Sequence, residues 1–233
     1  MTSPDPATGA VPSDHAGDRV YSCADPVTRR SGLEAAARTA RSGNLVVLPT
    51  DTVYGIGADA FNAAAVRALL AAKGRGPDMP VPVLVGSWST IDGLVLAVPP
   101  VARTLIEAFW PGGLSLVVEH APSLRWDLGD SHGTVMLRMP LHPVALDLLR
   151  MVGPMAVSSA NRSGHPPATA VDQAVEQLGE RVDVYLDGGP APIGVASTVV
   201  DVTGPVPRVL REGAVSIDRL REVVGEVEQL SAG

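Results

Sequence analysis

The chain contains a single lysine, Lys73, against seventeen arginines, and this lysine stands in the run Lys73-Gly74-Arg75. An ammonium is a compact, mobile point charge, whereas a guanidinium is a planar fork that binds carboxylate or phosphate through paired hydrogen bonds. A lysine and an arginine this close together could form a clamp for an anion. The alternative is a solvated helix end, where a cation stabilises the helix dipole.

Arg138 is a second candidate, because it is a charged residue in an otherwise apolar segment. It lies in the apolar run 134–139, which we predict to be a strand. A buried charge is costly unless another group pairs with it. An anionic ligand or a structural ion pair would each satisfy Arg138, and the sequence leaves both possibilities open.

Two segments of small polar residues each follow an apolar run that predicts a strand. Residues 49–55 follow the run 45–48, and residues 158–164 follow the run 155–157. Open α/β sheets bind ligands at the ends of their strands, so these hydroxyl and amide groups are well placed for a small polar ligand. Ordinary turns, in which such side chains satisfy local backbone groups, are the alternative.

Several familiar signatures are absent from the sequence. There is no G-x-x-x-x-G-K-[ST] phosphate loop, no G-x-G-x-x-G after a strand and no G-x-S-x-G elbow. The five histidines lack zinc-ligand spacing, and no metal-binding motif is visible. The single cysteine, Cys23, excludes an intrachain disulfide and a Cys-based zinc site.

The groups named above must be positioned by elements that the apolar patterning predicts. Residues 1–28 are rich in Pro, Asp, Ser and Gly and predict a disordered leader, and residues 29–233 predict one domain. Short apolar runs between breakers predict strands, and Ala- or Leu-rich periodic runs predict helices. The predicted strands are 45–48, 81–85, 114–119, 134–139, 155–157, 182–186, 197–202 and 207–210, and the predicted helices are 33–41, 62–72, 100–109, 142–150, 169–178 and 216–230.

This order of elements indicates an α/β protein. Strands that alternate with helices, together with a few strand–strand neighbours, predict a single-domain open mixed sheet with flanking helices. Pro80 and Pro82 should limit the strand 81–85 to an edge or to an irregular start.

Charge and hydropathy restrict the class of protein further. The net charge of −7 argues against a protein that coats nucleic acid by charge alone. No apolar run approaches the roughly 20 residues of a membrane-spanning helix. The N-terminal residues carry no apolar core of a secretory signal, so we expect a cytoplasmic protein without a membrane partner.

Taken together, these segments resemble the YrdC-like family, the L-threonylcarbamoyladenylate synthases, from about residue 33 to residue 217. The K-x-R and S-x-N signatures of that family are present as Lys73-Gly74-Arg75 and Ser159-Ala160-Asn161. Each motif alone is weak, but together, in the family's order, they are highly specific. The matching motifs are PTDTVYGIGADA (49–60), KGRG (73–76), WPGGLSLVV (110–118), LRMPLHP (137–143), SSANRSG (158–164), STVVD (197–201) and VLREGA (209–214).

The resemblance implies an ATP-dependent nucleotidyltransferase. Such an enzyme forms threonylcarbamoyl-AMP and pyrophosphate from L-threonine, bicarbonate and ATP, with Mg²⁺ expected alongside ATP. A separate transferase complex would then pass the threonylcarbamoyl group to an adenosine of tRNA. The resemblance also implies a twisted open sheet with a large, basic, concave face, and a homodimer is possible.

This reaction joins anions, so it needs positioning and charge neutralisation more than covalent catalysis. A site made of Lys, Arg, Ser, Thr and Asn fits that need. In the resemblance, Arg138 would pair with the carboxylate of threonine, and Lys73 would bind bicarbonate or carbamate and stabilise charge at the transferring phosphate. The implied catalytic residues are Lys73, Arg75, Ser159 and Asn161; the threonine-binding residues are Thr52, Arg138, Ser158 and Ser197; the ATP-binding residues are Arg75, Thr134, Ala160 (through its backbone) and Arg211.

The chain departs from the family pattern after the K-x-R signature. Met79-Pro80-Val81 stands where many relatives have Asn-Pro-Leu, and Leu84 stands where relatives often place a histidine near the substrate. These departures affect residues 76–85. Two other functions also remain open: an RNA-binding ribosome-maturation protein of the same fold, and a paralogue with altered activity.

Overall fold

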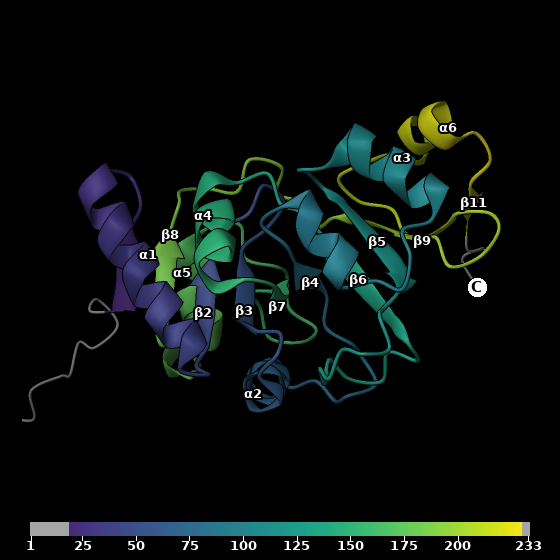
Figure 1. Cartoon of the computed structure of the whole chain (residues 1–233). Helices are drawn as coiled ribbons and strands as arrows, with labels where there is room; N and C mark the ends of the chain where they lie inside the picture. The colour runs from purple at the N-terminus through teal and green to yellow at the C-terminus, as the bar shows by residue number, and fades with distance from the viewer. Residues whose placement is uncertain (1–18, 230–233) are drawn as a thin grey trace, which may run out of the picture.

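The centre of the protein is one mixed β-sheet with helices on both faces. The structure, a computed structural model, describes residues 19–229. Within them, eleven strands are hydrogen-bonded in the order β1-β8-β2-β3-β7-β4-β6-β5-β9-β10-β11 (Figure 1). The sheet contains both parallel pairs, such as β5 with β9, and antiparallel pairs, such as β5 with β6. The predicted α/β class with an open mixed sheet is confirmed.

The strands and helices are shorter or longer than predicted at several ends. The strands are β1 (Val20–Ser22), β2 (Val46–Leu48), β3 (Gly55–Asp59), β4 (Val83–Leu84), β5 (Leu114–Glu119), β6 (Thr134–Arg138), β7 (Met155–Ser159), β8 (Val184–Asp187), β9 (Thr198–Asp201), β10 (Arg208–Arg211) and β11 (Glu228–Gln229). The helices are α1 (Pro26–Arg41), α2 (Ala63–Lys73), α3 (Pro100–Phe109), α4 (Pro143–Val152), α5 (Val171–Leu178) and α6 (Ile217–Val224), with short 3₁₀ turns η2 (Trp88–Gly93) and η3 (Gly179–Arg181).

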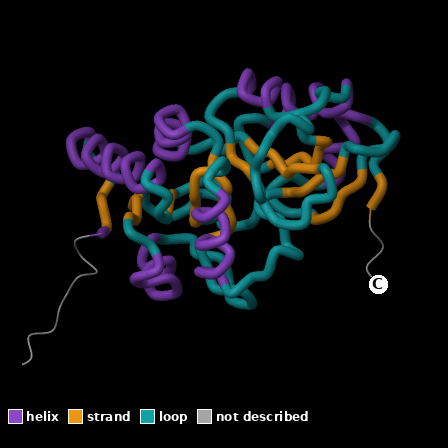
Figure 2. Tube along the Cα trace, turned by 60° about the horizontal axis from the view of Figure 1, so that its bottom comes forward, coloured by secondary structure: helices purple, strands orange, loops and turns teal. Residues whose placement is uncertain are grey.

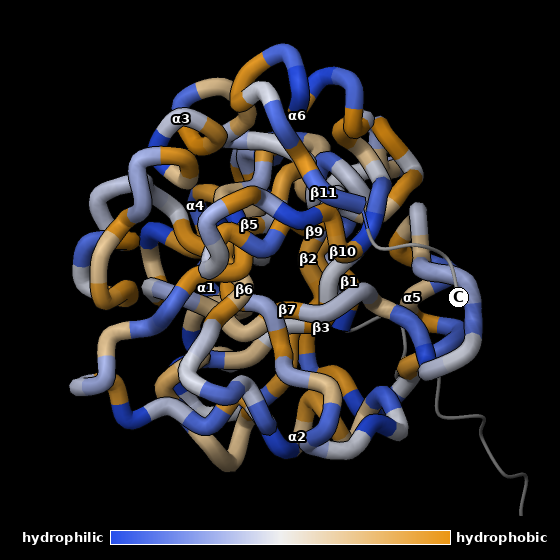
Figure 3. The backbone as a smooth tube through the Cα atoms, turned by 90° about the vertical axis from the view of Figure 1, so that its right-hand side faces the viewer, coloured by the Kyte–Doolittle hydropathy of each residue, from blue (hydrophilic) through white to orange (hydrophobic). Residues whose placement is uncertain are grey.

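Two apolar layers sandwich the sheet. Helices α1 and α4 pack side by side and form one buried cluster with β2, β7 and β8, and a larger cluster joins α2, α3, α5 and α6 (Figure 1). Neighbouring strand residues point to opposite faces, so Val83 belongs to the larger cluster and Leu84 to the smaller one. The strands run through the middle between the helices in Figure 2, and the hydrophobic segments gather in them in Figure 3.

Residues 19–28 are part of the fold rather than of a disordered leader. Strand β1 pairs in parallel with β8, and Asp25 caps α1 by accepting hydrogen bonds from the backbone N–H groups of Val27 and Thr28. Pro26 is the first residue of this helix, a position where its fixed φ and missing N–H are favourable. The prediction placed the helix start at residue 33, seven residues later than the structure does. The remainder of the predicted leader, residues 1–18, lies outside the described residues.

Strand β3 was missed because its sequence, GIGAD, is poor in strand-forming residues. It nevertheless lies between β2 and β7, paired antiparallel with both. A Cβ atom at Gly55 would lie 2.6 Å from Cγ1 of Val157, so only glycine admits the β7 side chain here. The strand therefore forms through its neighbours, and it carries the 49–54 loop towards β7.

The predicted strand 81–85 is reduced to the two residues of β4, and it is internal. It pairs with β6 in parallel and with β7 in antiparallel orientation, so the prediction of an edge strand is wrong. Pro82 joins the sheet only as an acceptor, because its carbonyl receives the N–H of Val157. The irregular start expected from the prolines is confirmed.

Helix α6 also differs from its prediction. Ser216 caps it by accepting the backbone N–H of Arg219, but the helix ends at Val224 rather than near residue 230. Gly225, with φ of 76°, ends it in a conformation that glycine adopts easily. In the part of the chain that the structure describes, no helix is long and apolar enough to cross a membrane.

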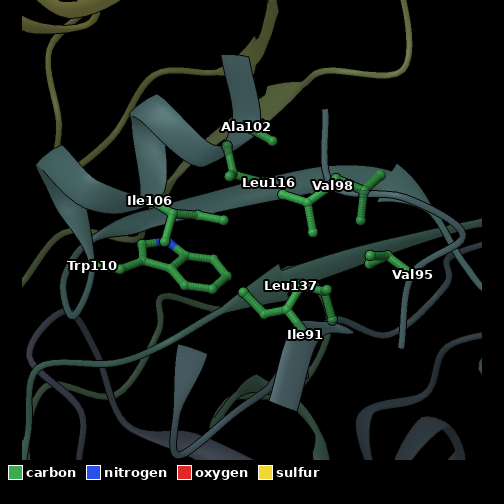
Figure 4. Close-up of a pocket in the computed structure, with 9 residues that line it drawn as sticks. Ile91, Val95, Val98, Ala102, Ile106, Trp110, Leu116 and Leu137 are labelled. Carbon is green, nitrogen blue, oxygen red and sulfur yellow. The ribbon is translucent and has the colours of Figure 1, made fainter. Parts of the chain in front are cut away.

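An apolar pocket lies between α3 and the face of β5 and β6. Its volume is about 10 Å³, close to the least that one water needs, and no polar group of the lining could bind that water. Figure 4 shows the side chains of Ile106, Trp110, Leu116 and Leu137 directed towards it. Trp110 keeps its indole N–H satisfied by donating to the carbonyl of Leu114 at 2.7 Å.

Replacing Leu116 by alanine would enlarge this pocket. We expect the free energy of unfolding, measured with urea, to fall by about 2–5 kcal/mol, because transfer and cavity terms add. Leu96→Ala is the matched control: Leu96 is 61% exposed, so its loss should cost less than about 0.5 kcal/mol. Equal losses for the two variants would contradict the assignment of this pocket to the core.

Candidate active site

The loop of residues 49–54 connects β2 to β3 and forms one wall of the candidate site. Its threonines are buried and organise the turn: Oγ1 of Thr50 donates to the carbonyl of Val53 at 2.6 Å and accepts the N–H of Thr52 at 3.2 Å. The hydroxyl of Thr52, which has no exposed surface, is directed to Arg138. The turn thus presents a fixed hydroxyl at the end of β2.

Arg138, the last residue of β6, is buried and held on three of its nitrogen atoms. Its Nε donates to the carbonyl of Gly112 at 2.8 Å, its Nη1 to Oγ1 of Thr52 at 2.8 Å and its Nη2 to Oδ1 of Asp51 at 2.6 Å. Burial lowers the pKa of Arg138, the charge of Asp51 opposes this, and Arg211 lowers it further. The structural ion pair that the sequence left open is present, and Asp51 is its carboxylate.

Ser197 directly precedes β9, and Arg211 is the last residue of β10. Arg211 donates from Nε and Nη2 to the carbonyl of Ser197, at 3.1 and 2.9 Å. The hydroxyl of Ser197 is shared with that of Ser115 on β5, at 2.9 Å. Ser197, a predicted threonine-binding residue, is therefore in direct contact with Arg211, a predicted ATP-binding residue.

Lys73 is not a solvated helix end. It is the last residue of α2, followed by Gly74 in the left-handed conformation, and only 1% of it is exposed. Its ammonium donates to the carbonyl of Ser159, to the carbonyl of Asn161 at 2.7 Å and to Oδ1 of Asn161 at 3.4 Å. Burial, and then the charge of Arg75, lower the pKa of Lys73 to about 7.

The K-x-R and S-x-N signatures are thereby joined into one unit. The amide of Asn161 donates to the carbonyls of Arg162 and His165 at 2.9 and 2.7 Å, which closes the loop after β7. The predicted loop begins later than expected, because Ser158 and Ser159 still belong to β7. Arg75 reaches back to the hydroxyl of Ser158 at 3.4 Å.

Two predicted ATP-binding residues, Ala160 and Thr134, already use hydrogen-bonding groups within the protein. The backbone N–H of Ala160 already donates to the carbonyl of Tyr54 at 2.8 Å, so any backbone contact of Ala160 with a nucleotide must use its carbonyl. Thr134 lies at the far end of β6 from Arg138, and its hydroxyl donates to the carbonyl of Ser131 at 2.8 Å. This hydrogen bond of Thr134 closes a turn, and the part of Thr134 in nucleotide binding stays a prediction.

Positive charge accumulates across the site. Arg75 lowers the pKa of both Lys73 and Arg211, and Arg211 lowers that of Arg138, so each cation repels the next. Within residues 19–229, the ion pairs of the structure give none of these cations except Arg138 a carboxylate partner. An anion bound among them would relieve this repulsion. The arrangement is therefore suited to ligands that carry several negative charges.

Leu84, the residue that replaces the family's histidine, is 4% exposed and packs in the cluster under α4. Its register partner in β6 is Arg138, so the two side chains leave the sheet on the same face. An apolar side chain here adds packing beside Arg138 and supplies no further hydrogen-bonding group. Met79, in the other divergent position, is 41% exposed.

Sequence analysis missed three groups that hold the predicted residues: Asp51, Ser115 and the carbonyl of Gly112. Asp51 had a usable signal. A buried arginine needs a carboxylate, and Asp51 stands between two threonines in a segment already expected to meet the site. Ser115 and Gly112 had none, because a hydroxyl in a strand and a backbone carbonyl look ordinary in sequence.

The described residues offer no built metal site. In residues 19–229, no three His, Cys, Asp or Glu side chains come together as potential ligands. Asp51, the carboxylate paired with Arg138, already uses one oxygen for two hydrogen bonds. The donor set of this site fits anions and does not fit a divalent cation held by protein ligands alone.

The chain is similar in sequence to proteins whose names state an activity. The chain is 66% identical over 205 residues to a protein of Mycobacterium tuberculosis named "Putative threonylcarbamoyl-AMP synthase", covering 88% of this chain and 94% of that protein. It is 39% identical over 197 residues to the "Threonylcarbamoyl-AMP synthase" of Bacillus subtilis, covering 84% of this chain and 57% of that protein.

Solved structures agree with the fold. The structure of Pyrococcus abyssi Sua5 complexed with L-threonine superposes with a TM-score of 0.86 at 34% identity, covering 90% of this chain and 62% of that one. Escherichia coli YciO superposes with a TM-score of 0.76 at 23% identity, over 87% of this chain and 98% of that one, which shows the fold alone. The family model Sua5_yciO_yrdC, described as "Telomere recombination", matches residues 38–213. The chain belongs to this Sua5/YciO/YrdC family.

Proposed function

We propose that the protein is a threonylcarbamoyl-AMP synthase, which forms threonylcarbamoyl-AMP and pyrophosphate from L-threonine, bicarbonate and ATP for the modification of tRNA. The observation that carries this proposal is the series Lys73, Arg75, Arg211 and Arg138, in which one cation repels the next and, within residues 19–229, only Arg138 has a carboxylate partner. Relatives that share up to 66% of aligned residues bear the name of this activity.

The reaction proceeds in two steps in this proposal. The amine of L-threonine and bicarbonate first give a carbamate and water. A carbamate oxygen then forms a bond to the α-phosphorus of ATP, the bond from that phosphorus to the bridging oxygen of the β-phosphate breaks, and pyrophosphate leaves. Both reactants and both products are anions, so the chain contributes mainly fixed positive charge and orientation.

The amino acid would bind where Arg138, Thr52 and Ser197 converge. Three of the five N–H groups of Arg138 are used by protein contacts, which leaves one on each terminal nitrogen for the carboxylate of threonine. Thr52 supplies a hydroxyl beside Arg138, Ser197 supplies one beside Arg211, and Ser158 lies beside Arg75. These roles are proposals that extend the hydrogen-bond pattern to a ligand.

The nucleotide would bind along Arg75 and Arg211, with the carbonyl of Ala160 and the hydroxyl of Thr134 as further contacts. Lys73 would neutralise charge at the carbamate and the α-phosphate, while Ser159 and Asn161 keep it in place. Mg²⁺ would arrive as part of the ATP complex, because the described residues form no site for it.

The test is pyrophosphate release by the purified protein with ATP, bicarbonate and L-threonine, each omitted in turn and threonine replaced by serine. We expect release only with all three substrates, and faster with threonine than with serine. A folded sample that releases no pyrophosphate, but binds RNA with steep salt dependence, would instead favour the RNA-binding function. A folded sample that does neither would favour a paralogue with altered activity.

The lowered pKa of Lys73 predicts a proton uptake on nucleotide binding. In the free protein its pKa is about 7, so at pH 8 the amine is mostly neutral. A bound polyanion favours the ammonium and raises this pKa, so the complex takes up a proton at pH 8 and much less at pH 6. Titration calorimetry of ATP in buffers of different ionisation enthalpy measures this uptake. A Lys73→Met variant that takes up as much as the wild type would assign the proton to another group.

A transferase complex and tRNA would consume the product, and a cytoplasmic location and a homodimer stay predictions. The threonylcarbamoyl adenylate is an activated acyl donor, so a downstream enzyme that transfers its acyl group to an amine must follow. The negative net charge of −7 is compatible with only transient contact with tRNA.

A further inference from the structure

Asp51 connects three segments around Arg138. Its Oδ1 accepts from Nη2 of Arg138 at 2.6 Å and from the backbone N–H of Leu141 at 2.9 Å. Its backbone carbonyl accepts the N–H of Ile193 at 3.0 Å. The side chains of Asp51 and Arg138 are 4% and 7% exposed, so this is a buried ion pair at the junction of β6, the 49–54 loop and the loop before β9.

The contacts of Asp51 fix the direction of the guanidinium. Arg138 is also held at Nε by Gly112 and at Nη1 by Thr52, so the plane of the fork is set from three sides. Without Asp51, the repulsion from Arg211 would act on a buried cation with no counter-charge. The guanidinium of Arg138 would then lose the negative charge that offsets the repulsion from Arg211.

Only one of the two carboxylate oxygens of Asp51, Oδ1, accepts hydrogen bonds from residues 19–229. Its Oδ2 is buried and has no hydrogen-bond partner in residues 19–229. The nearby imidazole of His142 also has a buried Nδ1 without a partner, and burial lowers the pKa of His142. In residues 19–229, Arg138 is the one charged group that the side chain of Asp51 contacts, so the carboxylate acts mainly on this guanidinium.

We propose that Asp51 is a positioning residue for amino-acid binding: it orients Arg138 so that the two remaining N–H groups of the fork face the carboxylate of L-threonine. The inference rests on the proposed function, because it requires Arg138 to bind that carboxylate. Asp51 itself touches no substrate. It sets the affinity for the amino acid while leaving the nucleotide site unchanged.

The experiment compares Asp51→Asn with the wild type by titration calorimetry. L-Threonine is titrated in the presence of a non-hydrolysable ATP analogue, and the analogue is titrated separately. Asparagine keeps the shape and an acceptor oxygen but removes the charge. We expect the Kd of threonine to rise by about ten- to hundredfold, with the Kd of the analogue within about threefold of the wild type. An unchanged threonine affinity, or an equal loss for both ligands, would overturn the proposal.

Asp147→Asn is the matched control. Asp147 pairs with Arg29 at 2.5 Å, but the two side chains are 39% and 29% exposed, lie on α4 and α1, and make no hydrogen bond to Asp51 or Arg138 within residues 19–229. This variant should keep both affinities. If the wild type itself binds no threonine, the proposed function fails. If the wild type binds threonine and Asp51→Asn binds it equally well, only the role of Asp51 is wrong.

Two further variants separate positioning from a structural role. In an Arg138→Gln background, adding Asp51→Asn should weaken threonine binding no further, because the two residues act through one fork. A further tenfold loss would mean that Asp51 acts independently of Arg138. If Asp51→Asn does not fold, Asp51→Glu keeps the charge and moves the carboxylate by one methylene. Asp51→Glu should fold and bind threonine more weakly, with an unchanged affinity for the ATP analogue. Threonine binding as tight as that of the wild type would overturn the proposal.

Discussion

Replacement of Lys73 by alanine is expected to lower the rate of pyrophosphate release by about a thousandfold or more, in a protein that still folds. The ammonium is buried against the loop after β7, where its contacts to Ser159 and Asn161 place it at the meeting point of the two signature motifs. Its removal withdraws a fixed charge from the carbamate and the α-phosphate. The measurement is the turnover number at saturating substrates, with circular dichroism to confirm folding.

Lys73→Arg tests why this lysine is the only one in the chain. A planar guanidinium cannot direct its N–H groups to the same three acceptors from the end of α2, so we expect it to lose nearly as much activity as alanine. Arg67→Ala is the control on the same helix, because its side chain is 64% exposed and pairs only with Asp127. Full turnover by either Lys73 variant would remove Lys73 from the proposed chemistry.

Replacement of Arg138 by alanine should remove threonine binding and also destabilise the protein. It leaves the carboxylate of Asp51 buried without its counter-charge, and breaking a buried pair in this way costs about 3–5 kcal/mol. It also removes the fork that we propose binds the amino acid. Urea unfolding gives the stability and titration calorimetry gives the affinity for L-threonine.

Arg29→Ala provides the comparison for this variant. Arg29 also pairs with an aspartate, Asp147, but both side chains are partly exposed, so we expect a loss of only about 0–1 kcal/mol and unchanged threonine binding. If the two variants were equally stable, Asp51 and Arg138 would not form the buried pair described above. If Arg138→Ala bound threonine normally, the amino-acid site would lie elsewhere.

The fold class and most elements could be predicted from sequence because their apolar runs are bounded by clear breakers. Strands β5 and β6 and helix α3 match their predictions closely, and Asn62 caps α2 by accepting hydrogen bonds from the N–H groups of Ala64 and Ala65. These elements carry their own signal in capping residues and periodicity. Each of them also has an apolar face that can only be buried one way.

The elements that were missed depend on partners distant in sequence. Strand β3 has little strand propensity and forms because Gly55 and Gly57 fit against β7, and β1 forms because β8 offers it an edge. The same holds for the site. The residue types of Lys73 and Arg138 indicated anion chemistry, but only the fold shows that Asp51 pairs with Arg138 and that the K-x-R and S-x-N signatures touch.

The most direct test of the proposed reaction follows the carbon of bicarbonate. The protein is incubated with ATP, L-threonine and ¹³C-bicarbonate, and the nucleotide products are analysed by mass spectrometry. We expect an adenylate that contains both threonine and the ¹³C label, formed in equal amount with pyrophosphate and absent with Lys73→Ala. An adenylate without the label would contradict attack of a threonine carbamate on the α-phosphate. Formation of ADP and inorganic phosphate in place of an adenylate would contradict it as well.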